Sequence, residues 1–315
     1  MDLPTIAEPA KFSDSAPEGA VWPRISLVTP VFNSGKYIEA TIRSILAQAY
    51  PNLEYFIIDG GSTDNTLNVI RKYESQISGW VSEPDNGMYD ALNKGFARTT
   101  GEVMGWISAT DQLHIGGLAV AGSVLRDLPD VEWITGRPTC INEEGMTVEV
   151  VSLPRWSRMR FLAGFNRYIQ QESTFWRRSL WDKAGGYVDA SRRMASDFDL
   201  WVRFFRHAQL YPVEALIGSF RKHHASLGLQ QLEVCHRIHD EILAAEWKRE
   251  PWGWAPRAFH RFNGKIVKKL PGIRYAWWKL VERPISTWPG PDRPPVIHYD
   301  MERGWVKGSD FKYDN

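Results

Sequence analysis

The sequence predicts an α/β protein with a mainly parallel central sheet flanked by helices, followed by a C-terminal helical extension rich in basic and aromatic residues. Three observations predict this fold class. Short apolar runs alternate with segments of helically spaced apolar residues through the first half of the chain. Polar residues follow these apolar runs directly. The 315 residues, 43% apolar and 24% charged, have the composition of a globular protein with room for a catalytic domain and an appendage.

The first two strand–helix units are the clearest part of the pattern. Residues Ile25–Val31 form a short apolar run, and apolar residues recur at helical spacing from Lys36 to Ala49. A second apolar strand spans Leu53–Ile58, and Asp64 is placed to cap a helix over Thr66–Tyr73. Two strand–helix pairs within so short a stretch predict a βαβ unit with parallel strands.

The alternation continues more weakly along the chain. Further helices are expected at Tyr89–Arg98, Gly117–Leu128, Leu180–Ala184, Asp197–Arg206 and Leu229–Lys248. Further strands are expected at Trp80-Val81, Val103–Ile107, Ser173–Trp176 and Leu210–Phe220, with Val131–Thr135 and Val148–Val151 flanking a turn at Glu144-Gly145.

Composition divides the chain into four parts. We predict a flexible leader (1–22), a catalytic domain (23–228), a C-terminal helical extension (229–283) and an extended Pro-rich tail (284–315).

Charge and cysteine content restrict the function classes. The net charge of +1 gives no argument for nucleic acid as a partner. Cys140 and Cys235 lie far apart without metal-ligand spacing, which favours a reducing compartment. No signal peptide and no apolar run of about 18–20 residues is found, so we expect a cytoplasmic protein, soluble or peripheral on a membrane.

Carboxylates and a carboxamide follow four successive strand candidates. Asn33 follows the first strand, Asp59 the second, Glu83 and Asp85 the third, and Asp111 the fourth. Each alone is also explained by turn formation, for which Asp and Asn are favoured. As a set they indicate a ligand site, because open α/β sheets bind ligands at the carboxyl ends of their strands.

Three strings in these segments carry a resemblance to a known family. TPVFN, IDGGSTD and YDALNKG, within about residues 24–225, resemble family 2 glycosyltransferases of the branch that builds bacterial surface polysaccharides. This resemblance implies the GT-A fold, which is the nucleotide-diphospho-sugar transferase fold, and inverting sugar transfer. It also implies that the catalytic domain has a nucleotide-binding half (23–112) and an acceptor half (113–228).

The resemblance implies a nucleotide site at the strand ends. Asp59 resembles the carboxylate that accepts from the ring N–H of uracil or guanine, a directional charge-assisted bond. Asp85 and Lys94 resemble residues near the nucleoside and its phosphates, whereas Asp90 is equally explained as a charge at a helix N-terminus. The nucleotide-binding set comprises Thr29, Pro30, Phe32, Asn33, Asp59, Gly60, Gly61, Ser62, Asp85, Lys94 and Thr110.

The metal position is where the sequence departs from the family. The family shows two or three acids that hold Mg²⁺ or Mn²⁺ on the diphosphate, and here only Asp111 remains, with Thr110 before it. Arg221-Lys222-His223, followed by Ser226, resembles an Arg-x-His-x-x-Ser segment whose His reaches the metal or the diphosphate. We therefore predict Mg²⁺ or Mn²⁺ held by Asp111 and His223, with phosphate oxygens completing the shell.

The second half supplies the candidate base and acceptor residues. Asp197, in the stretch Ser196–Trp201, matches the catalytic base of the family, which removes the proton of the acceptor hydroxyl, and Asp199 is expected to be structural. Acceptor-binding residues are predicted at Gln171, Glu172 and Trp176, with Trp176 equally explained as core.

The stretch Arg257–Arg283 combines eight Lys/Arg and one acid with Tyr275, Trp277 and Trp278. This is the composition of an amphipathic segment that binds an anionic membrane surface, although a helix packed on the core with a solvated basic face explains it too. Membrane binding predicts a peripheral protein on the inner face of the cytoplasmic membrane and an acceptor linked to a polyprenyl-diphosphate lipid.

The function predicted from the sequence is an inverting glycosyltransferase. It moves a sugar from a UDP- or GDP-linked donor to a hydroxyl of a glycan acceptor in bacterial polysaccharide, O-antigen or capsule synthesis. Two alternatives keep the fold. The first is a nucleotidyltransferase, which needs a Gly-rich loop with a basic residue near the N-terminus, and Thr29–Asn33 does not supply one. The second is a non-catalytic sugar-nucleotide-binding protein, which remains an alternative because Thr110 stands in place of an acid.

Overall fold

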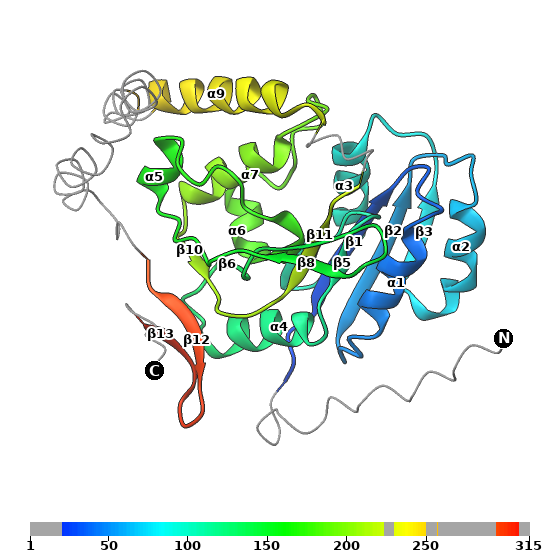
Figure 1. Ribbon diagram of the computed structural model, residues 1–315, viewed down its shortest axis with the longest axis horizontal. Helices are drawn as coiled ribbons and strands as arrows, with labels where there is room; N and C mark the ends of the chain where they lie inside the picture. The colour runs from blue at the N-terminus through cyan, green and yellow to red at the C-terminus, as the bar shows by residue number, and fades with distance from the viewer. Residues whose placement is uncertain (1–20, 224–229, 250–256, 258–293, 309–315) are drawn as a thin grey trace.

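The computed structural model describes residues 21–223, 230–249, 257 and 294–308 (Figure 1). The predicted leader therefore lies outside the described residues except for its last two positions. The basic and aromatic stretch beyond Arg257 also lies outside them.

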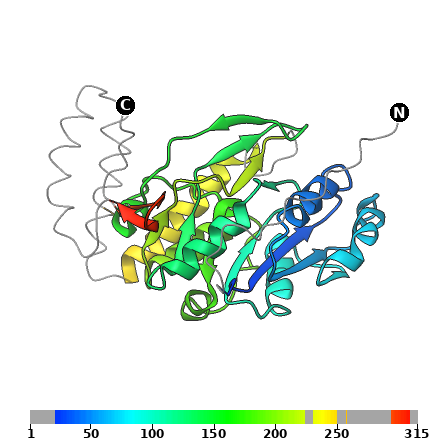
Figure 2. The same ribbon diagram turned by 90° about the horizontal axis from the view of Figure 1, so that it is seen from below.

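A seven-stranded, mainly parallel sheet forms the centre of the molecule, which confirms the predicted fold class (Figures 1 and 2). In spatial order the strands are β10 (Leu210–Pro212), β6 (Trp133–Thr135), β9 (Thr174–Arg177), β4 (Val103–Trp106), β1 (Ile25–Val31), β2 (Leu53–Asp59) and β3 (Gly79–Ser82). The parallel pairs are β1–β2, β1–β4, β2–β3 and β6–β10, and β9 runs antiparallel between β4 and β6.

Helices cover both faces of this sheet because its strands are apolar on both sides. Leu27 belongs to the core under one set of helices and Val28 to the core under the other, as the alternation of side chains along a strand requires. One face packs against α1 (Ile38–Leu46), α2 (Thr66–Lys72) and α4 (Gly117–Asp127). The other packs against α3 (Met88–Phe96), α5 (Arg158–Leu162), α6 (Arg178–Lys183), α7 (Ser196–Phe205) and α9 (Leu232–Arg249).

Tryptophan dominates the second of these cores. The indoles of Trp106 and Trp201 stack with centroids 5.7 Å apart, and Trp133 stacks on Trp201 at 5.6 Å. Trp176 meets Trp106 edge to face at 5.4 Å. Large aromatic side chains bury much apolar area at little conformational cost, so this cluster joins β4, β6 and β9 firmly to α7.

A second, four-stranded sheet has the order β5 (Gln112–Leu113), β11 (Gly218–Arg221), β7 (Thr139–Ile141), β8 (Thr147–Val150). The strands predicted at Val131–Thr135 and Val148–Val151 are found as β6 and β8. An additional strand, β7, pairs with β8 across the turn, while residues 133–135 join the main sheet. The strand predicted over Leu210–Phe220 is wrong. It divides into β10 and β11 because the chain changes sheets between them, where Gly218 lies so close to the Glu172 carbonyl that a Cβ would meet it at 2.0 Å.

The C-terminal segments pack on the catalytic domain. Ile242 and Leu243 of α9 are buried in the aromatic core, so the boundary predicted at residue 228 does not separate two packing units. The predicted extended tail contains a hairpin of β12 (Val296–Asp300) and β13 (Gly304–Gly308). Ile297 of this hairpin is buried and bridges Val213 beside β10, so the prediction of an extended tail is wrong for residues 296–308.

In the part of the chain that the structure describes, no helix is both long enough and apolar enough to pass through a membrane.

Candidate active site

The carboxyl ends of β1, β2 and β3 lie side by side at one edge of the sheet. Val31 lies opposite Asp59, and Asp59 lies opposite Ser82. Parallel pairing with this register brings together the loops that follow the three strands. The polar residues that the sequence places after these strands therefore share one edge, as expected for an α/β binding site.

Hydrogen bonds join the loop after β1 to the loop after β2. The Asn33 N–H donates to Ser62 Oγ at 2.7 Å, and the Thr63 N–H donates to Asn33 Oδ1 at 2.8 Å. The Gly35 N–H donates to Asp64 Oδ2 at 2.9 Å. Asn33 has a left-handed backbone (φ 47°), which Asn tolerates better than most residues. The two loops thus form one preorganised unit.

The Asp59 carboxylate organises this unit from within. It is buried, and its Oδ2 accepts from the N–H groups of Gly61 and Ser62 at 3.1 and 3.0 Å and from Ser82 Oγ at 2.7 Å. Ser62 Oγ donates to the other oxygen. Asp59 therefore fixes the loop conformation, and its predicted bond to a nucleotide base stays a prediction.

Asp85 lies directly against the loop after β2. A Cβ added to Gly60 would meet Asp85 Oδ2 at 2.6 Å, so the two loops approach this closely only because residue 60 is glycine. Lys94 Nζ donates to the Pro84 carbonyl at 3.1 Å and pairs with Glu83 at 3.1 Å. Lys94 thus holds the loop that carries Asp85, and its predicted approach to the phosphates is a separate role that stays a prediction.

Three residues predicted at the start of the nucleotide site have different environments. Phe32 is 60% exposed and Pro30 is buried. Thr29 is also buried, and its Oγ1 accepts from Tyr55 Oη at 3.0 Å. The prediction that Thr29 binds nucleotide is wrong for its side chain, because the pleat of β1 turns it into the core.

Asp111 lies deeper, where the β4–β5 segment meets β11. It is 1% exposed, its Oδ1 accepts from the Arg221 N–H at 2.9 Å, and its Oδ2 accepts from Gln171 Nε2 at 3.3 Å. Burial raises the pKa of Asp111 to about 7, and the hydrogen bond and charge of Arg221 offset part of that effect.

Glu172 brings a second carboxyl into this region. It is 2% exposed, and its Oε1 has no hydrogen-bond partner among the residues that the structure describes. Burial, followed by the charges of Asp111 and Asp197, raises its pKa well above the ordinary value. The charges of carboxyls from two other segments therefore act on Glu172, and they disfavour its ionisation.

Asp197 occupies the first turn of α7. The preceding residue but one, Ala195, has a left-handed backbone (φ 61°), a conformation that sets the direction in which the helix starts. Asp197 as a residue is partly exposed, but its carboxyl is desolvated, which raises its pKa, and hydrogen bonds from the Phe198 N–H and Tyr89 offset part of this effect. A carboxylate with a raised pKa has one property of a general base.

The predicted metal ligands do not form a complete site in the described part of the chain. No group of three His, Cys, Asp or Glu side chains that could hold a metal is found there. Both oxygens of Asp111 already accept protein hydrogen bonds, and the ring of His223 lies 5.3 Å from that of Tyr37. Thr110 supplies its carbonyl to Arg221 Nε at 2.6 Å. The described residues therefore form no site made of protein ligands alone, and a metal held by Asp111, His223 and phosphate oxygens stays a prediction.

Among the predicted acceptor-binding residues, Trp176 is out of reach of an acceptor because it lies in the core. Its side chain is fully buried in the tryptophan cluster, so stacking on a sugar is wrong and the core interpretation holds. Gln171 lies beside Asp111, and Glu172 lies within the group of carboxyls.

Two residues of the site were not found from the sequence. Tyr89 bonds to Asp197 from α3, and Arg221 is buried, with its guanidinium donating to the Asn142 and Glu143 carbonyls at 2.8 and 2.7 Å. Arg221 belongs to the segment that the sequence singled out for His223, so that motif was the available signal. Tyr89 precedes Asp90 in the YDALNKG string, which gave no reason to prefer it.

Comparison with known proteins identifies the family. The sequence model described as "Glycosyl transferase family 2" matches residues 26–137. An uncharacterized glycosyltransferase of Mycobacterium tuberculosis is 31% identical over 189 residues, covering 58% of this chain and 68% of that protein. The putative teichuronic acid biosynthesis glycosyltransferase TuaG of Bacillus subtilis is 33% identical over 93 residues, covering 29% of this chain and 37% of TuaG.

Solved structures share the fold at low identity. S. aureus TarS 1-349 in complex with UDP-GlcNAc has a TM-score of 0.61 at 16% identity, covering 78% of this chain and 74% of that one. Another S. aureus TarS structure is matched over only 39% of its length. The mannosyltransferase PcManGT from Pyrobaculum calidifontis, in complex with GDP-Man and Mn²⁺, has a TM-score of 0.54 at 16% identity, with 88% and 84% covered. The chain belongs to glycosyl transferase family 2 and has the GT-A fold of these glycosyltransferases.

Proposed function

We propose that this glycosyltransferase moves a sugar from a UDP- or GDP-linked donor to a hydroxyl of a glycan acceptor, with inversion at the anomeric carbon. The observation that carries the proposal is the group of carboxyls formed by Asp111, Glu172 and Asp197. Asp111 and Glu172 are buried whereas Asp197 is partly exposed as a residue, which supports Asp197 as the carboxylate nearest to an acceptor hydroxyl.

In the proposed reaction, Asp197 accepts the proton of the acceptor hydroxyl as the oxygen attacks the anomeric carbon. The bond from that carbon to the diphosphate oxygen breaks, and the nucleoside diphosphate leaves from the opposite face. One attack of this kind inverts the configuration and leaves Asp197 protonated. Tyr89 and the backbone N–H groups at the start of α7 hold the base in place.

The donor class is supported by the loops after β1, β2 and β3. Their preorganised backbone and the close approach at Gly60 suit a flat base and a ribose at the strand edge. The complexes of TarS with UDP-GlcNAc and of PcManGT with GDP-Man support a UDP- or GDP-sugar. Mg²⁺ or Mn²⁺ stays a prediction for this chain, and no step above depends on it.

The acceptor is proposed to be a growing polysaccharide, as the name of TuaG indicates for that protein. Lipid linkage and attachment to the inner face of the cytoplasmic membrane rest on the composition of Arg257–Arg283. Sedimentation with liposomes containing anionic lipid tests this part, comparing the full chain with one truncated before Arg257. Equal pelleting of the two proteins would contradict it.

The central proposal is tested by donor and product assays. Thermal-shift measurements with UDP-, GDP-, dTDP- and CMP-sugars identify the donor, because a ligand that binds only the native state raises the melting temperature. Release of the nucleoside diphosphate from that donor is then followed with an acceptor present, and NMR of the product gives the anomeric configuration. Retention of configuration, or near-normal transfer by Asp197→Asn, would refute the proposal.

A further inference from the structure

The first half of α9 lies against the start of α7, where the candidate base is found. His239 of α9 stacks on Phe198 with ring centroids 4.0 Å apart and an interplanar angle of 18°. Phe198 is the residue directly after Asp197. Burial, and then the Asp197 charge, raise the pKa of the Cys235 thiol, one helical turn before His239. This part of α9 therefore forms a wall beside the base.

One exposed aromatic side chain lies between this wall and solvent. Tyr168 is 55% exposed, its ring centroid lies 5.9 Å from that of His239, and its Oη shares a hydrogen bond with His236 Nε2 at 2.6 Å. The neighbouring Arg167 pairs with Asp240 of α9 at 2.7 Å. Two consecutive residues are thus tied to α9, so the open face of the Tyr168 ring has a fixed orientation.

We infer that Tyr168, held by His236, is a binding platform for a pyranose ring of the acceptor beside Asp197. The inference rests on the proposed function, since it assigns the platform to the substrate that Asp197 would deprotonate. No role has been given to α9 in the steps described above, and neither Tyr168 nor His236 belongs to the residues predicted from the sequence.

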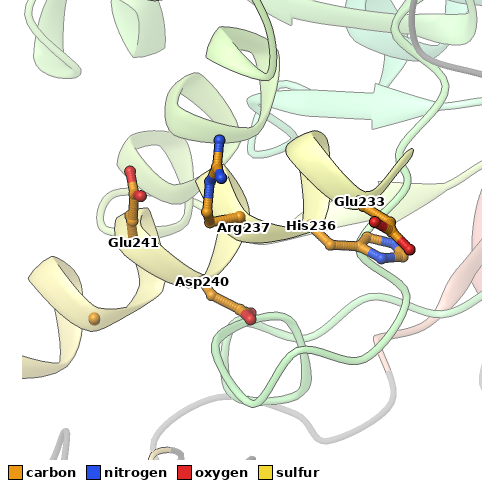
Figure 3. Close-up of a pocket in the computed structure, with 6 residues that line it drawn as sticks. Glu233, His236, Arg237, Asp240 and Glu241 are labelled. Carbon is orange, nitrogen blue, oxygen red and sulfur yellow. The ribbon is translucent and has the colours of Figure 1, made fainter. Parts of the chain in front are cut away.

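The chemistry of the platform matches a sugar ring. A pyranose presents C–H groups on its faces and hydroxyls around its edge, so it binds an aromatic face together with polar groups at the side. Tyr168 supplies the face. His236 lies at its edge, and Glu233 lies one helical turn before His236 on the same side of α9 (Figure 3). His236 and Glu233 also line a hollow on the surface of α9.

An alternative is that Tyr168 serves only to attach α9. That role would need the Tyr168–His236 bond but not the exposed ring face. Substitutions that separate the ring from its hydroxyl therefore distinguish the two roles. Tyr299 provides a matched control, since it is 56% exposed and packs edge to face on Trp305 in the C-terminal hairpin.

The test measures binding of octyl β-glucoside, octyl α-mannoside and octyl N-acetyl-β-glucosaminide to the full chain by saturation-transfer NMR. We expect Tyr168→Ala and Tyr168→Leu to weaken the best-bound glycoside about tenfold, and Tyr168→Phe to stay within about threefold of the parent. Tyr299→Ala should bind as the parent does. The two Tyr168 truncations guard against loss of fold in either one, and circular dichroism checks each variant.

Unchanged binding in both truncations, or no binding of any of the three glycosides by the parent, would overturn the inference. An equal loss in Tyr168→Phe and Tyr168→Ala would also overturn it, because the ring face would then contribute nothing. Release of nucleoside diphosphate into water is measured on the parent and on Tyr299→Ala with each donor, and the two should agree. If the parent releases none from any donor, the proposed function fails, whereas the glycoside titrations still decide the platform.

Discussion

Replacing Gly60 by alanine gives a direct test of the site at the strand edge. The added methyl would lie 2.6 Å from Asp85 Oδ2, whereas ordinary contacts of this kind begin near 3.4 Å. The Asp85 carboxylate must therefore move by about 0.8 Å. Gly60 itself has no positive φ, so the backbone accepts alanine and the effect comes from this contact alone.

The magnitude follows from what Asp85 loses. Its Oδ1 accepts from the Gly87 N–H at 2.8 Å, and we expect a shift of this size to weaken the bond. Hydrogen bonds to a charged group are worth about 1.5–3 kcal/mol, so we expect destabilisation of about 1–2 kcal/mol and a fall in melting temperature of about 2–6 °C. If Asp85 also contacts the nucleoside, donor affinity should fall about tenfold to a hundredfold.

The assay is a thermal-shift titration of the donor with Gly60→Ala, Asp85→Ala and the double variant. In the double variant the methyl has nothing to displace, so it should resemble Asp85→Ala alone. Gly116→Ala is the control, because Gly116 has a positive φ (80°) and no atom lies within 4 Å of the position that a Cβ would take. That variant should lose about 1–2 kcal/mol of stability to backbone strain while donor affinity stays the same.

Unchanged stability and donor affinity in Gly60→Ala would refute the close contact. An effect of Gly60→Ala that persists undiminished in the Asp85→Ala background would show that the methyl acts on some other group. Full donor affinity in Asp85→Ala would refute the assignment of Asp85 to the donor site.

Three further predictions concern the base, the metal and the end of the sheet away from the site. Asp197→Asn should lower kcat by a factor of about 10²–10⁴ with donor KM unchanged. Asp199→Asn should chiefly lower stability, because Asp199 pairs with Arg203 at 2.8 Å. Equal losses of kcat in both variants would contradict this prediction. Adding Mn²⁺ without nucleotide should leave the melting temperature of the protein unchanged, because both Asp111 oxygens accept protein hydrogen bonds. A rise in melting temperature would contradict this prediction. Glu54→Gln should destabilise the fold by about 2–4 kcal/mol in chemical denaturation at pH 7, because Glu54 is buried and accepts from Ser26 Oγ and the N–H groups of Thr100 and Gly101. Burial alone would raise the Glu54 pKa, but these hydrogen bonds lower it overall. The contribution of Glu54 to folding stability is therefore present above the unfolded pKa near 4.5 and disappears as pH falls through the lower folded pKa. A loss of stability in Glu54→Gln that stays constant down to pH 3 would contradict this prediction.

The strand–helix units of the nucleotide half were predictable because each carries its own signal. Apolar residues at helical spacing place α1 within the stretch predicted for it, and the apolar run over Leu53–Ile58 gives β2 to within one residue. The turn chemistry of Asp64 was also visible, since its Oδ1 accepts from the Thr66 N–H at 2.9 Å.

Short strands in the second half were harder to predict. A three-residue strand such as β6 or β10 has no measurable period, so its partner depends on which edge it reaches in three dimensions.

Trp176 shows the same limit for a side chain. An aromatic residue near acceptor candidates suits both a sugar platform and a core, and only the packing of Trp106 and Trp201 around it decides. Tyr168, seven residues after Phe161 in an irregular segment, gave no signal at all.

The sequence by itself determined the family, the α/β class and the polar residues at the ends of β1 and β2, because these follow from motifs and from periodicity within single segments. Only the tertiary structure decided that Thr29 faces the core, that the charges of Asp111 and Asp197 act on Glu172, and that α9 packs beside the base. Those facts depend on contacts between residues far apart in the chain. Such contacts are fixed by burial and by the register of neighbouring strands, and they leave no pattern in the local sequence.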